Sequence, residues 1–429
     1  MKKVLILAYD FEPLNSIGAQ RPLGWFKYFK QFGIHPVIVT RHWDEISEPN
    51  DLVKPSKKQT VETEENEFGT IVRVPFQPNR RDEILLKNGI EKKVFSRKIL
   101  SLIYSVGQFY WTGLDNRSTI LKEARNQLKT SDYDAIIATG EPFILFRYAS
   151  LLSKQFGVPW IADYRDGWSQ NYAALHSAQG LQKWLNENVF TNLEKRIVST
   201  ASLCTFTVES HQKEVEALIP NLKSEIVMNG YFEELFESLP KVDETIKPYT
   251  IAYSGTLYPY QELELFLEGF QLAIKEKRLD SEDIQLIFYG LEYQPEPLMR
   301  VLGFSDFLLP YIQTTQRMPL EDVIIQLNKT NALLLLATPS KEQIYAKVFD
   351  YIALKKPIVL CPNDNGSLEK IISTSPRPMI ANSALEVKET VLNLFQNPMT
   401  ETGKKLNTDT YSRRRQAERM ANLVDGLKK

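Results

Sequence analysis

Two carboxylates and a lysine lie close together near the end of the chain. Seven residues separate Glu342 from Asp350, and Lys347 lies between them. The apolar spacing of residues 346–354 predicts a helix, which places Lys347 and Asp350 on one face at i and i+3. An ammonium in a first helical turn adds to the positive charge of the helix end and can bind a diphosphate. The carboxylate of Asp350, one turn further on, can accept hydrogen bonds from both hydroxyls of a ribose. The alternative is an exposed ion pair.

A second charged group follows the predicted strand over residues 158–162. Asp163, Arg165 and Asp166 stand there within four positions. At the carboxyl end of a parallel strand they can position an acceptor hydroxyl and stabilise developing charge. The alternative is a pair between Arg165 and a carboxylate that holds the loop.

Three further loops follow predicted strands. Gly18 opens a helix after the first strand, where phosphates could approach backbone N–H groups, although the loop lacks the GxGxxG pattern. Glu141 precedes Pro142 at a helix start, where it can act on a ligand or favour the helix dipole. Residues 363–367 form either an amide-lined anion site or a turn.

Composition and motifs argue against metal or nucleic-acid chemistry. The 52 basic and 53 acidic residues balance, so no overall field attracts a polyanion. The two cysteines lie far apart, and the four histidines show no metal-ligand spacing. The DxD-like Asp132–Asp134 precedes its strand, at the wrong end of a parallel sheet. We expect no metal, no cofactor and no nucleic-acid partner.

The elements that position these residues alternate between strands and helices, which predicts two doubly wound α/β domains. A polar stretch over 54–67 is expected to be a solvated loop, and the proline-bracketed stretch 240–248 a linker. The predicted domains are residues 1–239 and 249–405, and a last helix within 406–429 crosses back to the first domain. Ligands of such sheets bind outside the carboxyl ends of the strands, so a central cleft is expected.

One segment is unusual for a protein surface. From Lys92 to Leu114 there is no acidic residue, and Lys92, Lys93, Arg97 and Lys98 precede an apolar, aromatic run that ends at Trp111. No apolar run is long enough to span a bilayer. Residues 92–111 therefore predict either a membrane-interface helix or a helix packed on its own domain.

Several sequence blocks occur in a characteristic order. YDFEPLNSIGAQR and FGIHPVIVT come first, then EKRIVSTASLCTFTV and EIVMNGYFEELF within 194–236, then IAYSGTLYPYQELELFLEGF, the Glu342 to Asp350 spacing, and NGSLE at 365–369. This ordered set resembles GT-B-fold glycosyltransferases of the retaining, metal-independent family 4 type, over nearly the whole chain. The blocks TGEPF and VPWIADYRDGW are most similar to a subgroup acting on amino sugars such as N-acetylfucosamine.

The resemblance implies roles for individual residues. Glu342 would contact the sugar hydroxyls, Lys347 would face the diphosphate, and Asp350 would hold the ribose. The implied donor-binding set is Gly18, Gly255, Thr256, Lys347, Asp350, Asn365, Gly366 and Ser367. The implied catalytic set is Asp163, Arg165, Asp166 and Glu342, with Glu141 and His211 on the acceptor side.

The chain departs from the family pattern at four places. The family's arginine after the donor-domain glycine is Thr256 here, and residues 259–261 supply no lysine. The second glutamate of the motif is Asp350, and the glycine after the motif helix is Lys355 or Lys356.

The resemblance thus predicts a cytoplasmic glycosyltransferase, peripheral to the inner face of the membrane in one interpretation. It would move a sugar from a UDP-linked donor, with retention, to a glycan or polyprenyl-linked acceptor of cell-surface polysaccharide. The alternatives are a non-catalytic GT-B protein that binds a nucleotide sugar or a partner, and a sugar-nucleotide epimerase.

Overall fold

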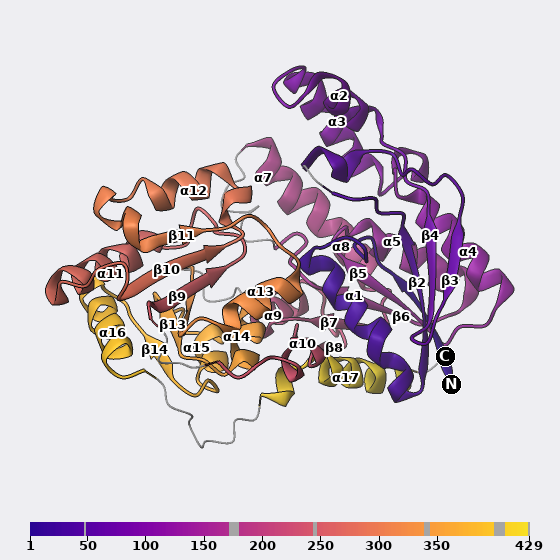
Figure 1. The fold of residues 1–429 in the computed structure, drawn as a ribbon. Coiled ribbons are helices and arrows are strands. Elements are labelled where there is room, and N and C mark those ends of the chain that lie inside the picture. Colours follow the sequence, from indigo (N-terminus) through magenta and orange to yellow (C-terminus); the bar gives the residue numbers. More distant parts are fainter. Residues whose placement is uncertain (47–48, 171–179, 243–246, 339–343, 399–407, 428–429) are drawn as a thin grey trace. The chain divides into compact units, whose positions relative to one another are not determined.

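The chain folds into two α/β units. The computed structural model describes residues 1–46, 49–170, 180–242, 247–338, 344–398 and 408–427. Residues 1–228 together with 414–429 form the first unit, and residues 229–413 form the second (Figure 1). The first unit thus ends before residue 239, the end expected from the sequence.

The first unit is built on one eight-stranded sheet of order β3-β4-β2-β1-β5-β6-β7-β8. Its strands are β1 Lys2–Leu7, β2 Ile34–Arg41, β3 Glu62–Glu65, β4 Thr70–Val74, β5 Ala135–Gly140, β6 Trp160–Tyr164, β7 Leu203–Phe206 and β8 Ser224–Ile226. All neighbours are parallel except β3 and β4. Consecutive residues Val4 to Leu7 of β1 are fully buried, so both faces of this central strand are covered.

Helices connect and cover these strands. They are α1 Ile17–Tyr28, α2 Arg80–Asn88, α3 Val94–Gly107, α4 Ser118–Thr130, α5 Ile144–Phe156, α7 Leu181–Leu185, α8 Thr191–Val198 and α9 Glu209–Leu218. The last helix, α17 Arg413–Asp425, belongs to this unit from Arg414 onward. Its buried stripe repeats at helical spacing, through Ala417, Met420, Ala421 and Val424.

The predicted solvated loop over 54–67 is wrong in part, because Glu62–Glu65 form strand β3. This strand pairs antiparallel with β4 at the edge of the sheet. Three of its four side chains are glutamates, and an edge strand can carry them on both faces because solvent reaches it. The missing apolar alternation explains why the sequence did not indicate a strand.

The second unit has a six-stranded, all-parallel sheet of order β11-β10-β9-β12-β13-β14. The strands are β9 Tyr249–Ser254, β10 Ile284–Tyr289, β11 Ile312–Thr314, β12 Ala332–Leu336, β13 Ile358–Cys361 and β14 Pro378–Ile380. The helices are α10 Glu234–Glu237, α11 Leu263–Lys277, α12 Pro295–Leu302, α13 Leu320–Asn328, α14 Lys347–Leu354, α15 Ser367–Ile372 and α16 Ala384–Gln396. The prediction of two doubly wound α/β domains is confirmed.

Strand order identifies where each unit can bind a ligand. In the first sheet the chain moves outward from β1 through β2, then returns to place β5 on the other side of β1. In the second sheet β9 and β12 have the same relation. Open α/β sheets bind ligands at such switch points, outside the carboxyl ends of the two strands.

Within the described parts of the chain, none of the helices combines the length and the apolar character that a bilayer crossing requires.

Candidate functional site

In the second unit, Gly255 and Lys347 meet at the switch point between β9 and β12. Gly255 directly follows β9, has a φ of +85°, and donates its N–H to the Tyr289 carbonyl at 3.0 Å. A Cβ placed on Gly255 would lie 3.8 Å from Lys347 Nζ. The positive φ favours glycine, and the open backbone leaves the lysine head group next to the loop.

Helix α14 is held against the end of β9 by a hydrogen bond. The Tyr351 hydroxyl accepts from the Ser254 N–H at 3.0 Å. The next loop residue, Thr256, accepts through its carbonyl from the Tyr253 hydroxyl at 2.7 Å. The first bond joins α14, which begins at Lys347, to the end of β9, and the second holds the loop that follows β9.

The amine of Lys347 is buried without a hydrogen-bond partner among the described residues. Its Nζ lies 3.7 Å from the centroid of the Tyr253 ring, and Tyr345 is the next aromatic ring, at 6.0 Å. Burial holds the pKa of Lys347 well below its usual range. A buried amine that lacks an acceptor is costly to ionise, so an anion that reached it would restore the charge.

Asp350 lies one turn further along α14. Burial raises the pKa of its carboxyl to about 7, although the positive charge of Arg413 opposes the rise. Such a carboxyl changes its charge near neutral pH. Sequence analysis missed Arg413, whose side chain is buried and lies over the Phe232 ring at 4.8 Å. It begins α17, within the predicted last helix, but it lies 63 positions after Asp350, so local spacing did not connect the two residues.

Glu342, the remaining member of the motif, lies outside the described residues.

In the predicted anion site at residues 363–367, the backbone N–H groups are already bound by a side chain of the same loop. Asp364 is buried, and its carboxylate accepts from the N–H groups of Leu368 at 2.8 Å, Glu369 at 3.0 Å and Gly366 at 3.2 Å. Asn365, with a φ of +46°, forms the turn, and Ser367 begins α15. This geometry matches the turn, the alternative interpretation of this loop.

Lys355 takes the left-handed conformation at the end of α14, with a φ of +57°. Of the two lysines at the position of the family's glycine, Lys355 is thus the one whose backbone favours glycine. Lys356 is buried instead.

In the first unit, Asp163 forms a buried ion pair. Arg21 Nη2 lies 2.6 Å from Asp163 Oδ1, and Arg21 Nε lies 2.9 Å from Oδ2. The Thr205 hydroxyl also donates to Oδ1 at 2.6 Å. Both side chains are almost fully buried, at 2% and 0% exposure. Asp163 thus joins α1 to β6 and presents no open oxygen to a substrate, and Arg21 is not available to bind phosphate.

Arg165 lies among carboxyl groups at the carboxyl ends of β1, β5 and β6. Its Nη1 is 3.4 Å from Asp10 Oδ2, its Nη2 donates to the Glu141 carbonyl at 3.2 Å, and its Nε is 3.6 Å from Asp166 Oδ2. A Cβ on Gly18 would lie only 1.8 Å from Arg165 Nη1. A larger residue at position 18 would therefore displace the guanidinium of Arg165 from its present place.

Two carboxyl groups of this cluster have raised pKa values. Burial raises the pKa of Asp10, against the charge of Arg165. Burial also raises the pKa of Glu141, and the negative charge of Asp166 adds to the rise. Sequence analysis missed Asp10, although its place three residues after β1 was a usable signal. The cluster can bind a polar ligand and exchange a proton near the switch point of the first sheet.

His211 is not part of this cluster. It is buried in α9, with its ring against Tyr164 and Phe206 at 5.3 Å each. Burial lowers its pKa to about 4.

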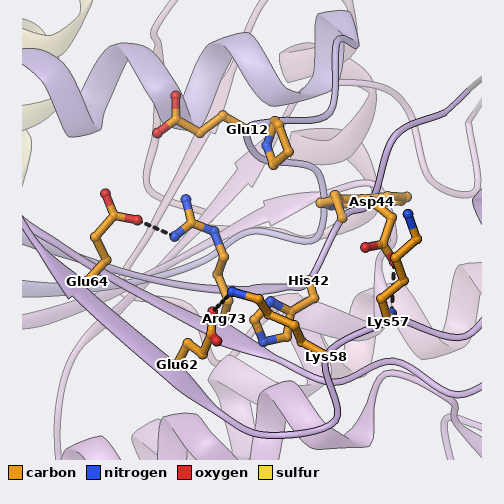
Figure 2. A pocket seen from close by; sticks show the side chains of 10 residues that line it. Glu12, His42, Asp44, Lys57, Lys58, Glu62, Glu64 and Arg73 are labelled. Carbon is orange, nitrogen blue, oxygen red and sulfur yellow. Dashed lines mark hydrogen bonds and ion pairs between the residues drawn. The ribbon is translucent and has the colours of Figure 1, made fainter.

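The first unit also has a cavity with a volume of about 550 Å³, which Figure 2 shows. Four of its charged side chains form two ion pairs: Lys58 Nζ lies 2.7 Å from Glu62 Oε2, and Arg73 binds Glu64. None of the residues predicted from the sequence lines it.

Solved structures show the same fold over the whole chain. A UDP-forming α,α-trehalose-phosphate synthase from Burkholderia xenovorans, in complex with glucose-6-phosphate, has a TM-score of 0.64 at 11% identity, covering 99% of this chain and 100% of that one. A sucrose-phosphate synthase from Thermosynechococcus elongatus has a TM-score of 0.55 at 13% identity, covering 99% and 95%. An Anabaena protein in complex with UDP and glucose has a TM-score of 0.51 at 11% identity, covering 99% and 95%.

The sequence matches no family model, and the search of curated proteins found no significant match. At these identities the similarity to solved structures establishes the fold, which is the GT-B type with two Rossmann-like units.

Proposed function

We propose that the protein is a retaining glycosyltransferase that takes a UDP-linked sugar as its donor. The observation that carries this proposal is the buried amine of Lys347, without a partner among the described residues and 3.8 Å from the Cβ position of Gly255, at the switch point of the second sheet. Switch points of such sheets bind nucleotides, and an amine in a first helical turn suits a diphosphate. UDP-forming and UDP-bound proteins among the similar folds support the choice of base.

The acceptor in this proposal is a glycan or a polyprenyl-linked sugar of cell-surface polysaccharide, handled at the inner face of the membrane. The resemblance to family 4, and to its amino-sugar subgroup, supports this choice. The cluster of Asp10, Glu141, Arg165 and Asp166 is the acceptor-side candidate, because it combines donors and acceptors at a strand switch point. Transfer needs no metal, since Lys347 supplies the positive charge for the diphosphate.

Calorimetric titration with UDP, GDP and dTDP in the presence of EDTA tests the donor proposal. We expect UDP to bind best, and Lys347→Met to weaken it, while Lys277→Met, an exposed lysine on α11, leaves it unchanged. Incubation with UDP-sugars and lipid-linked acceptors should then release UDP. Loss of binding in EDTA that magnesium restores would contradict the metal-free proposal.

A second candidate is a GT-B protein that binds a nucleotide sugar without transferring it. Two observations favour it: no cation follows Gly255 in the loop after β9, and Asp364 occupies the N–H groups at the start of α15. Tight UDP-sugar binding with no release of UDP under any acceptor condition would support this candidate.

A further inference from the structure

Helix α3 has its apolar side toward solvent. Phe95 is 77% exposed and Ile103 47%, and Ile99 and Leu102 are exposed as well. These positions recur at helical spacing, so they form one stripe along the helix. The α2–α3 pair lies at one end of the first unit (Figure 1).

The opposite side of α3 has polar side chains and faces the protein. Ser101, Ser105 and Gln108 line a cavity of about 230 Å³, and the Ser101 hydroxyl accepts from Arg81 Nε of α2 at 3.0 Å. Tyr104 lines the same cavity and Leu100 is half-buried, so α3 carries apolar side chains on both sides. Its outer apolar stripe, unlike the apolar side of an ordinary surface helix, does not pack on the core. A contiguous apolar stripe in water is unfavourable unless another apolar surface covers it.

Cations and aromatic rings lie at the two ends of this stripe. Lys92, Lys93 and Lys98 are exposed at its start, with Ile90 beside them. Tyr110 and Trp111 follow its end, at 49% and 67% exposure. Cations bind lipid phosphates, and tyrosine and tryptophan favour the level of the headgroups.

We propose that residues 92–111 form a docking surface for an anionic lipid bilayer, with the apolar stripe of α3 inserted at the acyl boundary and the lysines on the headgroups. The charge of this segment favours an anionic bilayer over a second copy of the chain, because there is no acidic residue from Lys92 to Leu114. A second copy would bring the same lysines against these, and their repulsion disfavours a dimer across this face. That docking brings the enzyme to a lipid-linked acceptor rests on the proposed function. The docking itself is inferred from the surface alone.

Co-sedimentation of the full chain with phosphatidylglycerol-containing vesicles tests the surface. We expect binding at low salt, release at high salt, and much weaker binding to phosphatidylcholine alone. Changing Lys92, Lys93 and Lys98 to Gln should lower the partition coefficient about 100-fold, at roughly fivefold per lysine. The matched control changes Lys122, Lys129 and Lys154 to Gln, which removes the same charge from α4 and α5 and should have little effect.

The apolar part has its own test. Phe95→Ser with Ile99→Ser and Ile103→Ser should lower partition about 100-fold or more, because each exposed side chain loses its burial in lipid. Met299→Ser with Leu385→Ser, which changes exposed apolar residues of the second unit, is the control. In brominated-lipid vesicles the tryptophan quenching should fall in Trp111→Phe.

Several results would overturn the proposal. These are no binding by the wild type at low salt, equal binding by the triple variants, or a dimer in sedimentation equilibrium that Phe95→Ser with Ile103→Ser makes monomeric without any lipid binding. UDP titration of the same variants separates this proposal from the proposed function. Docking that persists in a protein unable to bind UDP refutes the function alone, and UDP binding without docking refutes this surface alone.

Discussion

Replacing Lys347 by methionine should change both the affinity for UDP and the protons exchanged on binding. Methionine is unbranched and apolar, so it fills the space over the Tyr253 ring without the amine. A charge-assisted contact to a diphosphate is worth about 1.5–3 kcal/mol, which corresponds to roughly 10- to 150-fold in affinity. Uridine, which has no phosphate, should bind the variant nearly as well as it binds the wild type.

Proton exchange gives the sharper test. Burial lowers the pKa of Lys347 in the free protein, and a bound diphosphate raises it, because an opposite charge favours the ammonium. Between these two pKa values the amine is neutral before binding and charged after it, so UDP binding takes up a proton. Affinity should then fall as pH rises through that range, by up to about tenfold per pH unit.

Calorimetry in two buffers of different ionisation enthalpy measures this uptake. At pH about 8 a terminal phosphate, whose second pKa is about 6, is already ionised. We expect proton uptake for the wild type and for Lys277→Met, and none for Lys347→Met. Zero uptake in the wild type would mean that Lys347 is charged before the ligand arrives. Unchanged UDP affinity in folded Lys347→Met would refute the placement of the diphosphate.

Three further predictions concern stability. Lys355→Gly should stabilise the second unit by about 0.5–1 kcal/mol, because it relieves a left-handed backbone at some cost in chain entropy, whereas Lys356→Gly should destabilise it; urea unfolding of both variants decides the matter. Asp163→Ala should cost about 3–5 kcal/mol, because it leaves the Arg21 guanidinium buried and unpaired, and Arg21→Met with Asp163→Leu should recover much of that loss in the same assay. Since the pKa of Asp350 is raised to about 7, the folded protein keeps a proton that the unfolded chain releases near pH 4. The free energy of unfolding should therefore fall as the pH rises from about 4 to about 7. Asp350→Asn should abolish that dependence, which thermal unfolding across pH measures, and an unchanged pH profile would contradict the buried carboxyl.

The strands of the second unit show how far pattern reasoning reaches. The sequence pattern predicts strands over 249–254 and 284–289, and β9 and β10 have these bounds, because both are mainly apolar runs between polar loops. Strands β11 and β14 were not predicted, because each has only three residues, which are too few to show a pattern. Helix α14 was expected over 346–354, and its first turn holds Lys347 as the spacing indicated.

Some residues of the candidate sites could likewise be found from the sequence, whereas their distant partners could not. Lys347 and Asp350 could be selected from their local spacing on a predicted helix, and Gly255 from the family resemblance. The partner of Asp163 could not, since Asp163 is on strand β6 and Arg21 lies 142 positions away on helix α1. Likewise the cap that Asp364 places on α15 depends on how one turn closes, which no residue pattern in that loop distinguishes from an open anion site.

The amino-acid sequence by itself determined the two α/β sheets, their order along the chain and the residue types at the ends of their strands, because hydrophobic periodicity and loop composition are local properties. Only the tertiary structure decided which charges are already paired, which amine is buried beside a glycine, and that α3 has its apolar side toward solvent. Those outcomes depend on burial and on contacts between residues far apart in the chain, and burial is what shifts a pKa or leaves a side chain free to meet a ligand.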